Sequence, residues 1–114
     1  MEIAVRTPNI DWNESLRIQV ERSIEYAADR HRSRIDRISV CLSDRNGPRG
    51  GVDKVCRMTA YVRGISPVLI SESGDDLLAV IGRVARRLGF RIRSRIERRQ
   101  RSGAKYRATI RSAS

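Results

Sequence analysis

The chain has 114 residues and a formal net charge of +11 at pH 7, from 24 Lys and Arg side chains against 13 Asp and Glu. This length suits one domain with a modest core. The amino end lacks a basic and apolar leader, no apolar run approaches the roughly 20 residues that span a bilayer, and the two cysteines fit neither a disulfide framework nor a metal finger, so we expect a cytoplasmic protein.

The first part of the chain predicts a strand followed by a helix. Residues 2–6 alternate polar and apolar side chains, which is typical of a short strand. The helix that follows runs to about Arg30. Either Asn13 alone or Asp11 with Glu14 can cap its first turn. Its apolar stripe is formed by Leu16, Val20, Ile24 and Ala27.

The middle of the chain predicts three more strands. A stretch dense in Gly and Pro, residues 45–53, indicates a hairpin loop between the first two of them. The alternation of side chains places Cys41 and Cys56 on opposite faces of the sheet, which argues against a disulfide. The three predicted strands cover residues 35–43, 55–62 and 68–73.

A long helix follows and is predicted to end near Arg99. Ser73 and Asp76 have the spacing of a capping box at its start. Beyond Gln100 the chain has no apolar period, so we divide it into a domain, residues 1–100, and a basic tail, residues 101–114, that we expect to be disordered. The core stripe of this helix is Leu77, Ile81, Val84, Leu88 and Ile92, with Leu78 and Ala85 beside it.

The order of these elements, β-α-β-β-β-α, indicates a two-layer α+β domain. A right-handed crossover makes the first two strands parallel, and the remaining connections are antiparallel, so the four-stranded sheet is mixed. Both helices then cover one face of the sheet, and the other face meets water.

The last helix carries the whole excess of positive charge. Residues 1–82 hold twelve basic and twelve acidic side chains, whereas residues 83–114 hold twelve basic side chains and one acid, Glu97. Helix faces that are merely solvated usually mix signs, so this arginine-rich surface favours phosphate binding. Arg95 and Arg99 share the azimuth of the apolar stripe, where unpaired burial would be costly. We therefore expect the last two turns to project beyond the sheet as a basic rod.

Phe90 lies among these arginines and leaves two interpretations open. It packs against the first helix or a neighbouring molecule, or it provides a platform on which an RNA base stacks. The only histidine, His31, lies in a connector and is expected to be a surface residue. No set of nucleophile, base and orienting residue is found, so we predict neither an enzyme nor a metal, cofactor or small-molecule substrate.

Four stretches together resemble the ribosome hibernation-promoting factors, also called ribosome-associated inhibitor proteins. The resemblance covers about residues 1–100 through the order and spacing of MEIAV, ESLRIQVE, RISVCL and SESGDDLLAVIGRVARRL. It implies the β-α-β-β-β-α fold of the short members of the family. It further implies a non-enzymatic protein that binds small-subunit rRNA near the decoding channel, excludes mRNA and tRNA, and silences translation under stress.

The resemblance also suggests individual rRNA-binding residues. Arg17 matches the arginine of the family's first helix, and Arg87 matches the lysine of its second helix. Phe90 and Ser94 stand where the family commonly has basic residues. With the basic surface included, the predicted RNA-binding set is Arg17, Arg22, Arg83, Arg86, Arg87, Phe90, Arg91, Arg95 and Arg98.

Two other functions use the same surface. One is a stand-alone RNA or DNA binding protein with a fold like that of double-stranded-RNA-binding domains. The other is a protein-interaction module that docks its basic helix on an acidic partner. A membrane-surface role is disfavoured, because the exposed side of the helix lacks the Trp or Leu anchors of an interfacial helix.

Overall fold

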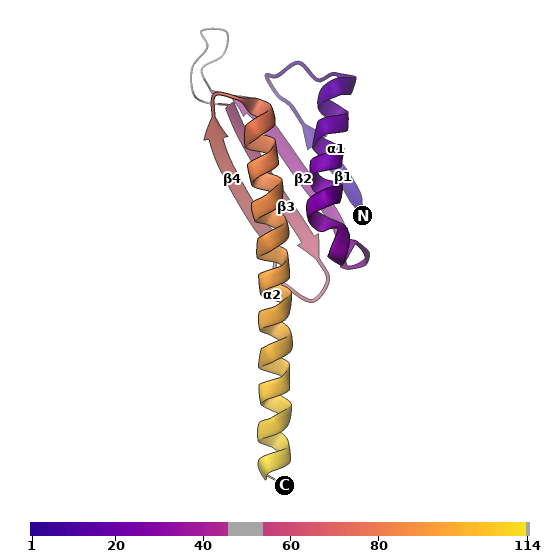
Figure 1. Ribbon diagram of the computed structural model, residues 1–114, viewed down its shortest axis with the longest axis vertical. Coiled ribbons are helices and arrows are strands. Elements are labelled where there is room, and N and C mark those ends of the chain that lie inside the picture. Colours follow the sequence, from indigo (N-terminus) through magenta and orange to yellow (C-terminus); the bar gives the residue numbers. More distant parts are fainter. Residues whose placement is uncertain (46–53, 114) are drawn as a thin grey trace.

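The computed structural model describes the backbone of residues 1–45 and 54–113 and the side chains of residues 1–45 and 54–101. Four strands form one sheet in the order β1-β2-β3-β4, and both helices lie on the same face of it (Figure 1). This is the predicted two-layer α+β fold. Its elements are β1 Glu2–Arg6, α1 Glu14–Ala28, the 3-10 helix η1 Asp29–Arg34, β2 Ile35–Asp44, β3 Lys54–Val62, β4 Val68–Gly74 and α2 Leu77–Ala113.

The sheet is mixed, as predicted. β1 pairs with β2 in parallel, whereas β2 with β3 and β3 with β4 are antiparallel. The predicted alternation also holds from Ile38 to Leu42 in β2 and from Cys56 to Val62 in β3, where every second residue is buried under the helices. The predicted hairpin loop at residues 45–53 lies outside the described residues except for residue 45. The buried side chains at the centre of the sheet are Ile38, Val40, Leu42, Cys56, Met58 and Ala60.

The two cysteines lie on opposite faces of the sheet. Leu42 is the register partner of Cys56, and Cys41 pairs with Arg57, so the two thiols point in opposite directions. Both cysteines are free; Cys56 is buried and Cys41 is half-buried. The prediction that they form no disulfide is confirmed.

α1 begins directly after Asn13, one of the two predicted caps. The Leu16 amide donates to the Asn13 side-chain oxygen over 2.8 Å, so Asn13 alone caps the helix. α1 ends at Ala28, two residues before the predicted end, because the chain tightens there into the 3-10 helix η1. Ala28 is buried and Ala27 is only half-buried, which shifts the predicted stripe by one residue at its last turn.

The predicted capping box of α2 is wrong. Ser73 belongs to β4, and Asp76 itself is the cap: its Oδ1 accepts from the amides of Leu78 at 3.1 Å and Ala79 at 3.4 Å. The single carboxylate therefore serves two free amides at the positive end of the helix dipole. Leu78, expected beside the core stripe, is 52% exposed instead, and Val80 takes its place in the core.

α2 also continues beyond its predicted end near Arg99 and reaches Ala113. Residues 101–113 contain no proline, and their arginine, lysine and alanine residues have high helix propensity, so the backbone keeps its helical hydrogen bonds without an apolar period. The helix runs well past the sheet and gives the molecule a long axis of 67 Å (Figure 1). A helix that projects beyond the sheet is thus confirmed, but the first of the two turns expected to overhang is still packed, because Ile96 is buried. The division at residue 100 into a domain and a tail stays a prediction, and the side chains of residues 102–114 lie outside the described residues.

Candidate nucleic-acid interface

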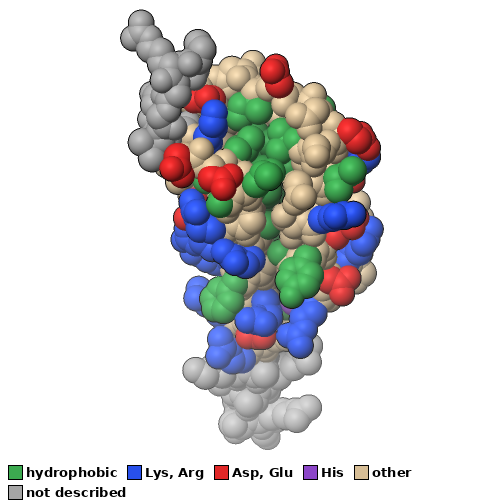
Figure 2. Space-filling view, turned by 45° about the horizontal axis from the view of Figure 1, so that its top comes forward, with side chains coloured by type: hydrophobic (Ala, Val, Ile, Leu, Met, Phe, Trp, Pro, Cys, Tyr) green, Lys and Arg blue, Asp and Glu red, His purple; other side chains and the backbone are tan. Residues whose placement is uncertain are grey.

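The basic surface is built on α2, whose core stripe anchors it to the sheet. Val84, Leu88 and Ile92 are each at most 2% exposed, and Ile96, one turn later, is 3% exposed. The helix is therefore packed to Ile96, after which residues 97–101 are all exposed. Figure 2 shows the Lys and Arg side chains gathered over the lower half of one face, toward the end where α2 projects.

Two of the predicted arginines are partly neutralised by a carboxylate of the sheet. Glu72 on β4 points toward α2, where its oxygens lie 3.6 Å from Arg83 Nε and 3.5 Å from Arg87 Nη1. Arg83 also donates to the Ser73 carbonyl over 3.4 Å. One carboxylate between two guanidinium groups leaves a net positive charge there, and both arginine side chains lie beside β4.

Arg95 is partnered by a backbone carbonyl rather than by a carboxylate. It lies on the sheet side of α2, as its azimuth predicts, and is half-buried rather than projecting freely. Its Nη1 donates to the Pro67 carbonyl over 3.4 Å, in the turn before β4. The side chain thus finds a backbone acceptor, and the overhang begins one turn later than the azimuth of Arg95 suggests.

Three predicted arginines on α2 remain available to a ligand. Arg86, Arg91 and Arg98 are exposed, and within the described residues none of them makes an ion pair. A guanidinium that is not paired within the protein loses no internal contact when it binds phosphate. These side chains are therefore the strongest candidates for phosphate contacts.

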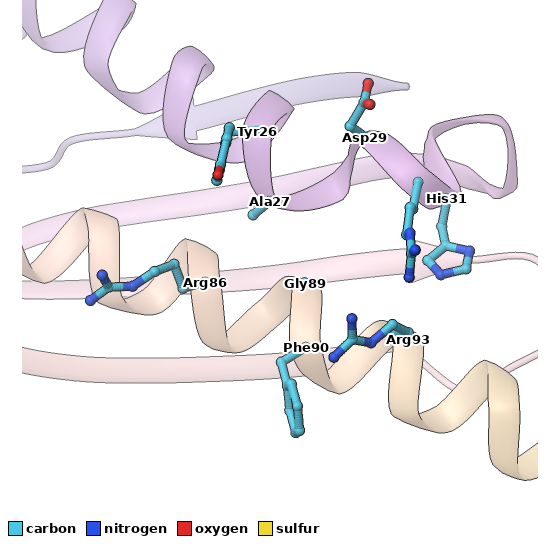
Figure 3. Close-up of a pocket in the computed structure, with 9 residues that line it drawn as sticks. Tyr26, Ala27, Asp29, His31, Arg86, Gly89, Phe90 and Arg93 are labelled. Atoms are coloured by element: carbon cyan, nitrogen blue, oxygen red, sulfur yellow. The ribbon is translucent and has the colours of Figure 1, made fainter.

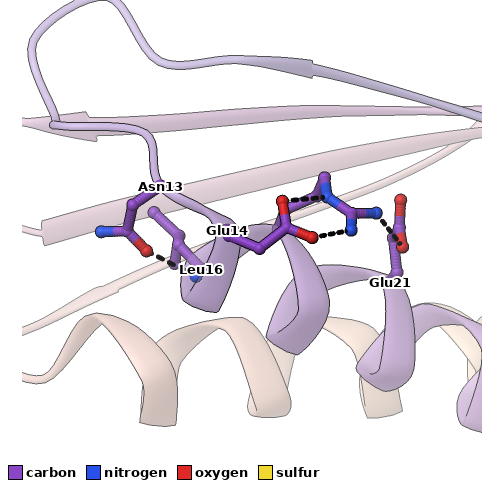
Figure 4. Close-up of polar contacts among 5 residues, drawn as sticks. Asn13, Glu14, Leu16 and Glu21 are labelled. Carbon is purple, nitrogen blue, oxygen red and sulfur yellow. Dashed lines mark hydrogen bonds and ion pairs between the residues drawn. The ribbon is translucent and has the colours of Figure 1, made fainter.

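Arg17 is not among the free arginines. Its guanidinium is bound by Glu14 and, over 2.8 Å, by Glu21 (Figure 4). These hydrogen bonds raise the pKa of Arg17, and the same contact lowers the pKa of Glu14. Arg17 shares a pocket with Ile3 and Val5 of β1, so the structure does not bring it together with the arginines of α2.

The groove between the two helices contains side chains that the sequence prediction left out. At its centre Gly89 of α2 lies against Ala27 of α1, so closely that a Cβ atom on Gly89 would be 2.4 Å from the Ala27 carbonyl oxygen. A pocket of about 370 Å³ opens beside this contact. Figure 3 shows its lining residues, among them Tyr26, Ala27, Asp29, Arg30, His31, Arg86, Gly89, Phe90 and Arg93.

Phe90 does not pack into the protein. It is 65% exposed, and its ring carries the Arg93 guanidinium 5.3 Å from the ring centre. Tyr26, which lines the same pocket from α1, is 87% exposed. A signal for this pair is present in the sequence, because Arg22, Tyr26 and Arg30 recur at helical spacing, as do Arg86, Phe90 and Arg93.

The open face of the sheet is a weaker candidate. The Arg37 guanidinium lies 4.6 Å from the centre of the Tyr61 ring, and Arg6 and Arg57 flank Cys41 across neighbouring strands. Within the described residues no group of three or more His, Cys, Asp or Glu side chains is placed to hold a metal ion. No helix in the described part combines the length and apolarity that a bilayer crossing needs.

Several solved structures resemble this chain, and two of them illustrate the likeness. A ribosomal subunit interface protein from Coxiella burnetii superposes with a TM-score of 0.73 at 15% identity, over 85% of this chain and 99% of the other. The N-terminal domain of Protein Y from Thermus thermophilus gives a TM-score of 0.63 at 22% identity, over 80% of this chain and 91% of the other. No protein-family model and no curated protein matches the sequence. The family resemblance seen in the sequence is thus confirmed at the level of the fold, which this chain shares with a ribosomal subunit interface protein.

Proposed function

We propose that the protein is a non-enzymatic ribosome hibernation factor of the cytoplasm, which binds small-subunit rRNA near the decoding channel and blocks translation by occlusion. The observation that carries the proposal is the exposed arginine surface of α2, mounted on a fold shared with a ribosomal subunit interface protein. The motifs ESLRIQVE and SESGDDLLAVIGRVARRL support it independently.

Binding begins with the exchange of counterions for guanidinium groups. Phosphates of folded RNA carry condensed cations, and each arginine that neutralises a phosphate releases one of them. Arg86, Arg91 and Arg98 supply these contacts first, because they give up no internal ion pair. Arg83 and Arg87 contribute with Glu72 still beside them, which makes each of their contacts weaker.

Occlusion follows from the shape of the molecule. Its extents of 67 × 23 × 18 Å describe a narrow body that continues into the long helix α2. A body of this kind, seated on rRNA phosphates, fills space that mRNA and tRNA need, and no chemical step is required. Sequence-independent phosphate contacts supply the affinity, and the shape of the RNA groove supplies the position.

The first experiment compares targets. The protein is sedimented with whole ribosomes, with each separated subunit and with a naked RNA duplex, at one salt concentration. Preferential recovery with the small subunit is the expected result. Equal recovery with the duplex would replace the proposal with a general duplex-binding function, and the absence of nucleic-acid binding would favour an acidic protein partner.

The second experiment tests the surface. Reversing Arg86 and Arg91 to Glu is expected to abolish recovery with the small subunit, because two phosphate contacts become repulsions. Arg87 is left unchanged, since a glutamate there would face Glu72 and disturb the fold. The matched control reverses Arg6 and Arg57, which are exposed on the open face of the sheet. Loss of binding in the control alone would move the interface from the helices to the sheet.

A further inference from the structure

Two large aromatic side chains stand in solvent on facing helices. The chain has one Phe, three Tyr and one Trp, and two of these five aromatic residues lie at this groove. Phe90 on α2 is 65% exposed and Tyr26 on α1 is 87% exposed. Aromatic rings usually bury their large apolar surface, so a pair left in solvent beside one pocket indicates a ligand with a flat, stackable face.

The backbone contact between the helices creates the pocket. Because Gly89 has no side chain, α2 meets the Ala27 carbonyl of α1 directly. Residues next in sequence to this contact, Tyr26 and Phe90, then stand at the edges of the groove rather than inside it. In Figure 3 the Tyr26 side chain extends from α1 toward α2, while the Phe90 ring points away from α1. The two rings thus offer separate platforms along one groove.

The groove is also cationic. Arg30, Arg86 and Arg93 line it, against a single carboxylate from Asp29. Arg93 lies over the Phe90 ring, an arrangement that holds the guanidinium in place beside the aromatic face. A ligand that suits this pocket therefore combines planar rings with negative charge at short intervals. Single-stranded nucleic acid has this composition, since each nucleotide joins a base to a phosphate.

We propose that an unpaired segment of RNA crosses the groove, with its bases stacking on Phe90 and Tyr26 and its phosphates held by Arg86 and Arg93. The inference rests on the proposed function for the choice of RNA as ligand, and it adds a subsite that reads unpaired bases. Phosphate contacts alone cannot separate paired from unpaired RNA, whereas stacking requires a base that is free of its helix. The groove thereby favours a loop or bulge over a regular duplex.

The test measures affinity for a short fluorescent single-stranded RNA and for the same oligonucleotide with abasic sugars, which retains every phosphate. The unaltered protein is expected to bind the base-containing strand roughly tenfold or more tightly than the abasic one. Replacing both Phe90 and Tyr26 with Leu removes this difference, because leucine is apolar but cannot stack. Phe90→Trp with Tyr26 intact keeps or strengthens the preference for the base-containing strand, because tryptophan also stacks. Leu78→Ala, an exposed apolar position on α2 that does not line the pocket, leaves both affinities unchanged.

The opposite results overturn the inference. Equal affinity for the two oligonucleotides, or unchanged discrimination in the double leucine variant, removes the stacking subsite. Tighter binding of an acidic peptide than of RNA, lost in the same variant, assigns the groove to a protein partner instead. All substituted positions are exposed, and a thermal melt of each variant verifies the fold.

The two proposals fail separately. If Arg86 and Arg91 reversed to Glu abolish small-subunit recovery while the leucine variant keeps both recovery and base discrimination, the ribosome proposal stands and the stacking subsite falls. If no ribosomal particle is bound while base-dependent binding of the oligonucleotide persists, the ribosome proposal falls and the stacking subsite stands.

Discussion

At the scale of single residues, the internal partner of each arginine decides which arginines are free to bind. Arg17 is enclosed by two carboxylates, and this pairing is readable in the sequence, since Glu14 and Glu21 stand at i−3 and i+4 on one helix. The pairing of Arg83 and Arg87 with Glu72 is not readable, because it depends on how α2 crosses β4. A count of charges in the sequence therefore overstates the number of arginines that are free to bind a ligand.

The two thiols differ for a similar reason and allow a prediction. Burial, helped by the charges of Cys41 and Glu72, raises the pKa of the Cys56 thiol from its ordinary 9.0 to about 12. The reactive thiolate of Cys56 is thus suppressed in the folded protein. Iodoacetamide at mildly alkaline pH is expected to modify half-buried Cys41 long before Cys56, as followed by peptide mass spectrometry. In denaturant the two rates converge; equal rates without denaturant would contradict the buried position of Cys56.

The raised pKa of Cys56 also makes the stability of the folded protein depend on pH. A pKa raised in the folded state means that the folded protein holds its proton where the unfolded chain has lost it. The contribution of Cys56 is therefore complete below its unfolded pKa and disappears as the pH rises through about 12. We expect chemical denaturation midpoints to fall on this alkaline side, and less so for Cys56→Ala.

At the scale of elements, one glycine sets how closely α1 and α2 approach. Gly89 and Gly82 both lie within α2, yet a Cβ atom at Gly82 meets nothing within 4 Å, whereas one at Gly89 collides with the Ala27 backbone. A backbone carbonyl cannot rotate aside as a flexible side chain does. The helices must therefore move apart if Gly89 gains a side chain, and the groove between them, which Tyr26 and Phe90 line, widens as a result.

This contrast predicts opposite effects of one chemical change. Gly82→Ala is expected to stabilise the protein by about 0.5–1 kcal/mol, because alanine has the higher helix propensity and the site has room. Gly89→Ala is expected to destabilise it by about 1–3 kcal/mol through overpacking. Urea unfolding measures both free energies. A stabilising Gly89→Ala variant would mean that the helices do not touch at Ala27.

At the scale of the whole molecule, the excess of positive charge lies on the same helix, α2, that gives the molecule its long axis. Asp75 and Asp76 lie at the amino end of α2, whereas arginines recur from Arg83 to its last turns, so the acids and the arginines near the carboxyl end complement the helix dipole. The packed stripe ends at Ile96, and the helix continues for a further distance beyond the sheet (Figure 1). The sheet and α1 thus hold α2 in place, and α2 presents the charge along its exposed side.

The salt dependence of binding measures this arrangement. If six to ten phosphates are neutralised, affinity for the small subunit is expected to fall roughly a thousandfold or more between about 50 and 200 mM salt. A chain that stops at residue 101 loses Lys105, Arg107 and Arg111 but no buried residue of the described core. We expect it to keep its unfolding free energy within about 0.5 kcal/mol and to show a shallower salt slope. A clear loss of stability would show that residues 102–114 belong to the domain.

The sequence by itself determined the main helices and strands, the topology, and the presence of a helix whose charged side chains are almost all positive. Those features depend on short-range periodicity, so the alternation in β2 and β3 and the stripe of α2 could be read directly. The sequence did not predict the Asp76 cap, the exposed Leu78 or the length of α2, because several local patterns are compatible with each helix end.

Only the tertiary structure decided which charges are free and which residues share a groove. Tyr26 and Phe90 are more than sixty positions apart in the chain, and only the contact of Gly89 with Ala27 brings them to one pocket. Glu72 likewise meets Arg83 and Arg87 because β4 lies beneath α2. Such meetings depend on how two elements cross, and helical or strand periods carry no information about that crossing.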